Sequence, residues 1–240
     1  AAARLPRLPA ACALRASPEL IEVELQGIGF MPTFWEMNLA AVTSDQKRLF
    51  IAKAHCVFAY ALPLDHGVYP TEVVRLAAPD RFNNSINQLC VGKMHGEEVV
   101  VCVTNGQHVL VLFAHALTQQ PILAFKTRAC AWSVAMDPQE CSLAVGSNAH
   151  EIVTFRFTPF TTSPPETCLV ETLRGHHHNI PCIAYSPCGG FIASTSIDGT
   201  VRLWDTELKR HYMLRSMPTD VLRVYNSDVP GFSYRNWGWY

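Results

Sequence analysis

Short apolar segments recur along this chain in groups of three, and this repetition constrains the fold more than any other feature. Tight-turn residues separate the segments of a group, and in the first three groups a longer connection leads to a fourth segment. An aromatic residue recurs near the end of the third segment, at Tyr60, Phe113, Phe155 and Trp204. The interval of roughly 45 residues, without helical periodicity, predicts four-stranded sheets repeated along the chain.

This interval distinguishes between two all-β architectures. A β-sandwich also contains many short strands, but it does not predict such a period. We therefore predict an all-β, propeller-type fold with about four blades and the start of a fifth. The predicted parts are an irregular lead-in over 1–35 and a partial propeller over 36–240, with blades near 37–76, 86–125, 130–173 and 180–215 and the next blade beginning at 232–240.

The predicted number of blades is small for a closed ring, because propellers of this type usually close with more than four. We therefore expect an incomplete ring and a chain that is a fragment of a longer protein. Two alternatives stay open: two arcs that assemble into one ring, and a truncated product without a function of its own.

Charge and cysteine content narrow the function classes. Lys and Arg total 19 against 20 Asp and Glu, so no basic excess supports direct nucleic-acid binding. The nine cysteines are odd in number and have no CxxC spacing, which predicts an intracellular protein of the nucleus or cytoplasm. No apolar run approaches the ~18 residues that would indicate a membrane span.

The fourth repeat carries the most specific motif. A Gly-His start, a Ser-Pro turn, an Asp-Gly turn and a Leu-Trp-Asp end follow one another over residues 175–205, which resemble a WD40 repeat. The resemblance implies a structural hydrogen-bond relay formed by His176, Ser196, Asp198 and Trp204. In this expectation Asp198 holds one imidazole nitrogen, and the Ser196 hydroxyl joins the other nitrogen to the indole N–H.

The same residues invite two other interpretations, a Ser-His-Asp triad and a histidine metal site. Trp204 would fill the space that a substrate needs, and no oxyanion-hole loop is evident. Adjacent histidines, as at 176–178, rarely aim at one ion. The acids Asp137, Glu151 and Asp220 are scattered. We therefore expect no enzymatic activity, cofactor, metal or small-molecule substrate.

The third repeat lacks the relay, because Ala149 and Phe155 stand where Asp198 and Trp204 stand in the fourth. We expect apolar packing there instead. The segments 132–135, 145–155 and 173–181 together are similar to a fungal WD40 family associated with transcriptional control of ribonucleotide reductase genes. The similarity covers roughly 36–240, including 236–239, which look like the start of that family's next blade.

The resemblance implies a scaffold that binds other proteins, and the absence of a long apolar run predicts that no membrane is among its partners. We predict partner contacts at the loop residues His177, Asn179 and Ile197. An alternative is a substrate receptor of a cullin-type ubiquitin ligase, whose motif has an Arg two residues after Trp-Asp. Glu207 occupies that place here and reverses the charge.

Overall fold

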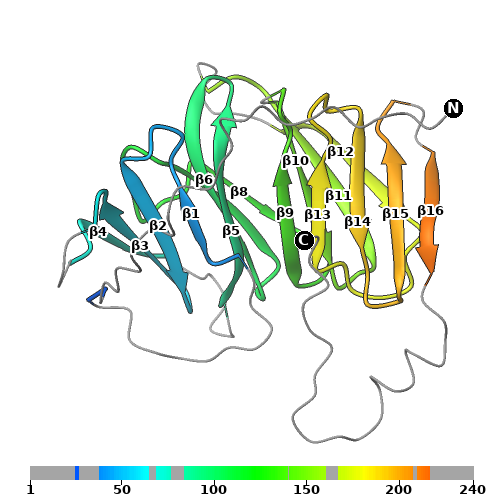
Figure 1. The fold of residues 1–240 in the computed structure, drawn as a ribbon, viewed down its shortest axis with the longest axis horizontal. Coiled ribbons are helices and arrows are strands. Elements are labelled where there is room, and N and C mark those ends of the chain that lie inside the picture. The colour runs from blue at the N-terminus through cyan, green and yellow to red at the C-terminus, as the bar shows by residue number, and fades with distance from the viewer. Residues whose placement is uncertain are drawn as a thin grey trace, which may run out of the picture.

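A computed structural model describes residues 25–26, 38–64, 69–76, 84–139, 141–160, 167–207 and 210–216. Within these residues the regular structure consists of sixteen strands in four antiparallel sheets of four (Figure 1). The predicted start of a fifth blade, at 232–240, and nearly all of the predicted lead-in lie outside the described residues. None of the described residues forms a helix that is long and apolar enough to cross a bilayer.

Each sheet is a meander whose strands follow one another in sequence. The first sheet contains β1 (Ala40–Val42), β2 (Arg48–Lys53), β3 (Cys56–Ala61) and β4 (Glu72–Arg75). The second contains β5 (Ile86–Met94), β6 (Glu97–Thr104), β7 (His108–Phe113) and β8 (Leu123–Lys126). The third contains β9 (Ala131–Met136), β10 (Ser142–Ser147), β11 (Glu151–Phe157) and β12 (Thr167–Arg174). The fourth contains β13 (Cys182–Tyr185), β14 (Phe191–Thr195), β15 (Thr200–Asp205) and β16 (His211–Ser216).

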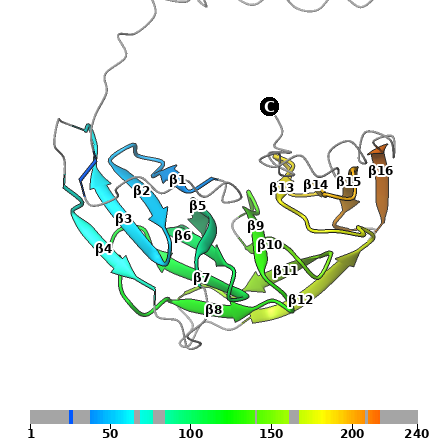
Figure 2. The same ribbon diagram turned by 90° about the horizontal axis from the view of Figure 1, so that it is seen from below.

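The four sheets stand side by side in an open arc (Figure 2). The first strands of the sheets, β1, β5, β9 and β13, lie on the concave side, and the last strands lie on the convex side. Contacts between these first strands join each sheet to the next. The predicted all-β arrangement of repeated four-stranded blades is confirmed.

The strand β6 shows why the apolar segments are continuous. Its side chains alternate between the two faces of the sheet. Val99, Val101 and Val103 pack toward the third sheet, whereas Val100 and Cys102 pack toward the first. Both faces of this sheet are therefore buried, and a strand in that position needs an unbroken apolar run.

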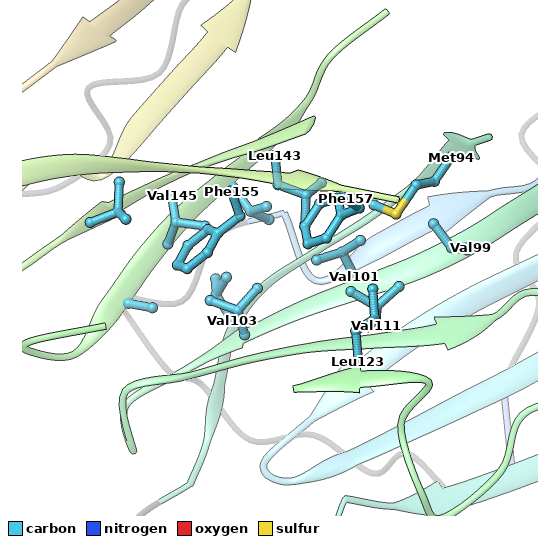
Figure 3. Packing of buried hydrophobic residues seen from close by; sticks show 14 residues of the cluster. Met94, Val99, Val101, Val103, Val111, Leu123, Leu143, Val145, Phe155 and Phe157 are labelled. Carbon is cyan, nitrogen blue, oxygen red and sulfur yellow. The ribbon is translucent and has the colours of Figure 1, made fainter. Parts of the chain in front are cut away.

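The largest apolar cluster lies between the second and third sheets (Figure 3). The rings of Phe125 and Phe155 stack there with 5.0 Å between centroids. Burying side chains of this size contributes about 1.5–3 kcal/mol each. The cluster between the third and fourth sheets is smaller and contains Ala144, Ile152, Ile180, Ile183, Ile192 and Trp204. The fourth sheet therefore depends more on polar contacts.

The predicted aromatic repeat is wrong by one residue in the second sheet. Phe155 and Trp204 both point toward the preceding sheet. Phe113 points the opposite way and packs against the cluster with the third sheet. Leu112, which is fully buried against the first sheet, holds the equivalent position. A shift of one residue along a strand exchanges its two faces, so an aromatic pattern by itself does not fix the register.

Candidate functional site

The relay residues come from four separate parts of the fourth repeat. His176 lies in the segment between β12 and β13, Ser194 on β14, Asp198 in the β14–β15 turn, and Thr200 and Trp204 on β15. The turn forms because Asp198 Oδ1 accepts a hydrogen bond from the Thr200 N–H at 2.8 Å. Gly199 completes it with a φ of 78°, a conformation that suits glycine.

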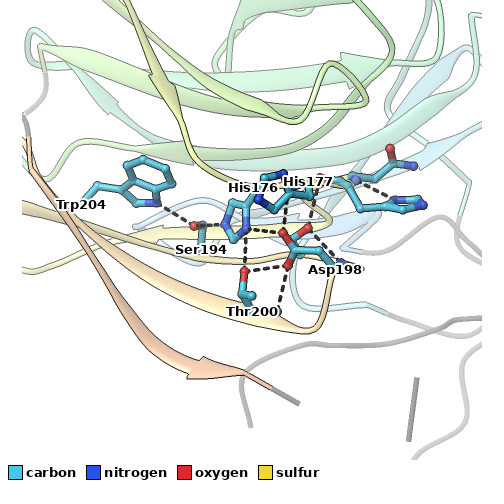
Figure 4. Close-up of polar contacts among 9 residues, drawn as sticks. His176, His177, Ser194, Asp198, Thr200 and Trp204 are labelled. Atoms are coloured by element: carbon cyan, nitrogen blue, oxygen red, sulfur yellow. Dashed lines mark hydrogen bonds and ion pairs between the residues drawn. The ribbon is translucent and has the colours of Figure 1, made fainter. Parts of the chain in front are cut away.

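Hydrogen bonds connect these side chains into one chain (Figure 4). Trp204 Nε1 donates to Ser194 Oγ at 2.7 Å, and Ser194 Oγ lies 2.8 Å from His176 Nε2. His176 Nδ1 lies 3.2 Å from Asp198 Oδ2 and 3.0 Å from Thr200 Oγ1. Thr200 Oγ1 donates to Asp198 Oδ1 at 2.6 Å. The relay therefore joins the third strand of the sheet to the loop before the first.

One arrangement of protons satisfies every member of the relay. The indole N–H is only a donor, so Ser194 Oγ accepts from it and donates its own proton to His176 Nε2. Nδ1 then carries the imidazole proton and donates it toward Asp198 and Thr200. The side chain of His176 is 0% exposed and that of Asp198 is 9% exposed. A buried network of this kind stabilises the fold because it leaves none of its groups without a partner.

Asp198 supplies the fixed negative charge of the relay. Burial raises the pKa of Asp198, but hydrogen bonds from His176, from Thr200 and from the backbone N–H of His177 outweigh it and lower the pKa below its ordinary value. The His177 N–H donates to Asp198 Oδ2 at 2.7 Å. The ionised carboxylate therefore holds the loop before β13 as well as the turn after β14.

The structure corrects one predicted relay residue, because Ser194 and not Ser196 joins the imidazole to the indole. Both serines face the same side of the hairpin as Trp204, whose partner in β14 is Ile192. Each further pair of residues along a strand adds about 6.6 Å, so only Ser194 is near enough to the indole. Ser196 Oγ instead donates to the His178 carbonyl at 3.1 Å.

Thr200 was missing from the predicted relay. It lies two residues after Asp198, and a hydroxyl at that distance from an aspartate in a turn is a recognisable hydrogen-bonding pattern. This two-residue spacing was the sequence signal that could have identified Thr200 as a member of the relay. The Thr200 hydroxyl bonds to both the His176 imidazole and the Asp198 carboxylate, so it adds a second link between these two side chains.

The relay is built for structure and not for nucleophilic attack. Ser194 is fully buried, and its hydroxyl is engaged by both His176 and Trp204. A substrate carbonyl therefore has no approach to Ser194 Oγ. Among the residues that the structure describes, no three His, Cys, Asp or Glu side chains are grouped to hold a metal ion. Asp137 and Glu151 lie at opposite ends of the third sheet, and Asp220 is outside the described residues.

The predicted contact residues lie on the loops that the relay holds. His177 is exposed, and Asn179 and Ile197 are half-buried. A backbone hydrogen bond of 3.0 Å from Ile197 N to the Asn179 carbonyl joins the two loops. His178 is exposed beside them and stacks on His150 of the third sheet at 5.7 Å. Their role as partner contacts stays a prediction.

In the third sheet, the positions equivalent to the relay residues carry different side chains. Val145 stands where Ser194 stands, and Phe155 stands where Trp204 stands, so apolar contact replaces the hydrogen bonds. Glu151 occupies the place of Thr200. Its Oε2 accepts from Arg174 Nε at 3.1 Å and lies 3.8 Å from Arg128 Nη1.

A cavity of about 370 Å³ lies between the third and fourth sheets, at the end opposite to the relay. Its polar lining includes Asp137, Arg156, Glu171, Tyr185 and Glu207. Burial raises the pKa of Tyr185 to about 12. Sequence reasoning missed this cavity because it combines segments that are far apart in the chain and have no shared motif.

Comparison with known proteins places these observations in a family context. Residues 167–205 match the WD40 family, described as WD domain, G-beta repeat. The match begins at β12 and ends at β15, so one sequence repeat joins the last strand of one sheet to three strands of the next.

Two relatives extend the similarity along the chain. A WD40 repeat-containing protein of Dictyostelium discoideum is 31% identical over 183 residues, which is 76% of this chain and 26% of the relative. The serine-threonine kinase receptor-associated protein of Mus musculus is 29% identical over 171 residues, which is 71% of this chain and 43% of the relative. The chain thus spans less than half the length of these relatives.

A solved structure shows the same fold. A chain in the crystal structure of a mitotic checkpoint complex matches with a TM-score of 0.60 and 16% identity, over 89% of this chain and 59% of that chain. The sequence match, the relay geometry and the arc of sheets agree with one another. The chain contains a WD40 repeat over residues 167–205, and its described sheets are arranged as blades of a WD40-type β-propeller.

Proposed function

We propose that this chain is a non-catalytic scaffold that binds another protein through the face of the arc that carries the relay. WD40-repeat proteins typically act as protein-interaction scaffolds. The observation that carries the proposal is that the relay fixes the two loops around Asp198 and leaves His177 exposed. A loop that is held in one conformation loses less entropy when it binds a partner.

The finer proposal concerns the process that the scaffold serves. We infer a role in transcriptional control of the ribonucleotide reductase genes, supported by the resemblance of the third and fourth repeats to the fungal WD40 family named above. The ubiquitin-ligase receptor is the second candidate. Glu207, which is exposed and has the opposite charge to the expected Arg, argues against that role for this repeat.

Affinity purification of the full chain from cells, after mild cross-linking, tests the scaffold proposal. The triple variant His177→Ala, Asn179→Ala and Ile197→Ala should lose most of the captured partners. The matched control replaces three exposed residues at the other end of the sheets, Lys47, Glu97 and Glu207, with Ala. Equal capture by the wild type and both variants contradicts the proposed contact face.

The same experiment separates the two finer roles. Transcriptional regulators among the captured proteins, together with altered ribonucleotide reductase transcript levels when the chain is depleted, support the first role. Recovery of the linker protein of a cullin-type ligase, without any transcript change, supports the second.

A further inference from the structure

We propose that the relay face binds an acidic segment of a partner protein, with Arg128 and Arg174 as its anchors. The relay face is defined here as the end of the sheets that carries the turns 54–55, 105–107, 148–150 and 196–199. This inference rests on the scaffold function proposed above and adds the chemistry of the partner.

Charge is distributed unequally between the two ends of the sheets. Among the described residues, the relay face carries the basic side chains of Lys53, Arg75, Lys126, Arg128 and Arg174. Its acids within the same described ranges are Glu151 and Asp198, which are 3% and 9% exposed and are engaged in contacts within the chain, as are Lys53 and Lys126. For the described residues, basic charge therefore dominates the accessible surface of this face, where Arg75, Arg128 and Arg174 are exposed.

The opposite face has the reverse character. Its acidic residues, again within the described part of the chain, are Asp45, Glu72, Glu97, Glu98, Asp137, Glu171, Asp205 and Glu207. They outnumber the bases there, which are Lys47, Arg48, Lys93, Arg156 and Arg210. An acidic partner is therefore attracted to the relay face and repelled from the other, which orients the encounter.

Arg128 and Arg174 form the centre of the basic surface. Both guanidinium groups contact the same oxygen of Glu151, at 3.8 Å and 3.1 Å. One carboxylate is shared by two cations, so a net positive charge is left at the surface. The two arginine side chains are 72% and 65% exposed, so an incoming group reaches them without displacing other residues.

The contact geometry leaves hydrogen-bond donors for a ligand. Arg174 uses its Nε to bond to Glu151, and its remaining N–H groups make no hydrogen bond to the described residues. A guanidinium with an open fork binds a carboxylate through two parallel hydrogen bonds. The stacked and exposed imidazoles of His150 and His178 lie on the adjoining loops and add further donors. The surface thus matches successive Asp or Glu side chains.

Nucleic acid fits the surface less well than an acidic peptide does. Binding to a phosphate backbone needs many basic contacts along a strand. Here the chain carries a net charge of −1, and acids dominate the opposite face. Only Arg128 and Arg174 meet at the buried Glu151 carboxylate, whereas Lys53 and Arg75 lie on the first sheet, so the described bases form a pair with outlying charges and not one continuous track. We therefore commit to an acidic protein segment as the occupant.

Fluorescence anisotropy with a labelled ten-residue polyglutamate peptide tests the proposal. The full chain should bind the peptide at low salt, and binding should weaken as salt is added. The variant Arg128→Gln with Arg174→Gln should weaken binding at least tenfold, which corresponds to about 1.4 kcal/mol. The matched control, Lys93→Gln with Arg156→Gln, removes the same charge from the opposite face and should change binding by less than about twofold.

Three results would overturn the proposal. The first is an equal loss of binding in both double variants, which would show attraction by total charge only. The second is binding of an oligothymidylate of equal charge that is as tight as that of polyglutamate. The third is no binding of polyglutamate by a wild-type chain that still captures partners through His177, Asn179 and Ile197. That last result leaves the scaffold function intact and removes only the acidic chemistry.

A third variant separates loss of the guanidinium fork from loss of the fold. Arg174→Lys keeps the positive charge but removes the planar fork. It should retain the salt dependence and bind polyglutamate several-fold more weakly than the wild type. Unchanged affinity in this variant would show that the fork does not hold the carboxylate, and it would overturn the role of Arg174 as an anchor.

Discussion

The third and fourth sheets solve the same packing problem with different chemistry. In each sheet, one large aromatic side chain on the third strand packs toward the preceding sheet. The third sheet uses Phe155, which stacks on Phe125 within a large apolar cluster. The fourth uses Trp204, whose indole N–H begins a chain of hydrogen bonds through Ser194 and His176.

This difference predicts that mutations will destabilise the two sheets in different ways. Apolar packing depends on volume, and neighbouring side chains adjust when volume is lost. A buried polar chain depends on every partner, because removal of one member leaves the others unsatisfied. The third sheet should therefore respond in proportion to the volume removed, and the fourth should respond to the loss of single atoms.

Phe155→Ala gives the largest expected effect. It removes a ring that is 3% exposed from the cluster between the second and third sheets. The free energy of unfolding should fall by about 3–5 kcal/mol. Urea unfolding measures this loss, and Phe155→Leu should recover more than half of it because it refills most of the volume. No recovery with Leu would mean that the ring stacking, and not volume, sustains the third sheet.

His176→Ala should cost about 3 kcal/mol, because it leaves Asp198 charged and Ser194 and Thr200 with fewer partners in the interior. Hydrogen exchange should show the loss of protection mainly in β13, β14 and β15. His177→Ala removes the exposed neighbour and should stay within about 0.5 kcal/mol of the wild type. A uniform loss of protection over all four sheets would contradict a local role for the relay.

The pH dependence of stability provides a third distinction between the sheets. The folded state lowers the pKa of Asp198, so this group contributes stability above its ordinary value of about 3.9. The contribution is fully present above about pH 5 and is lost as the pH falls toward the folded-state value. Asp198→Asn should therefore lower the urea midpoint at pH 6, and its difference from the wild type should only begin to narrow near pH 3, because the folded-state pKa lies well below that value. Glu97→Gln, an exposed control, should show no such convergence.

Periodicity and composition were enough to predict the sheets, because burial on two faces requires long apolar strands such as Val99–Val103. The register within a sheet was harder to predict. Phe113 and Leu112 are adjacent and equally compatible with a strand, and only the contact with the first or the third sheet distinguishes them.

Some features of the candidate site could likewise be predicted from the sequence, and others could not. The turn at Asp198 follows from a local motif, since Asp198 bonds to Thr200 two residues away. Its contact with His176, 22 residues away, followed only from the resemblance to a WD40 repeat. The Arg128–Glu151–Arg174 cluster and the cavity near Tyr185 arise from long-range contacts between separate loops. A local sequence pattern cannot predict which residues from separate loops will contact one another.

Ser194→Ala and Ser196→Ala should have the smallest effects, yet they distinguish the two possible relays most directly. Ser194→Ala leaves the Trp204 N–H buried without an acceptor and should cost about 1–3 kcal/mol. Ser196→Ala removes the hydrogen bond to the His178 carbonyl and the one from the Asp198 N–H, and should cost about 1 kcal/mol without leaving the indole unpaired. A double-mutant cycle with Trp204→Phe separates the two serines further. Coupling should appear with Ser194 and be absent with Ser196, whereas coupling of Ser196 alone would restore the relay expected from the motif and contradict the one described here.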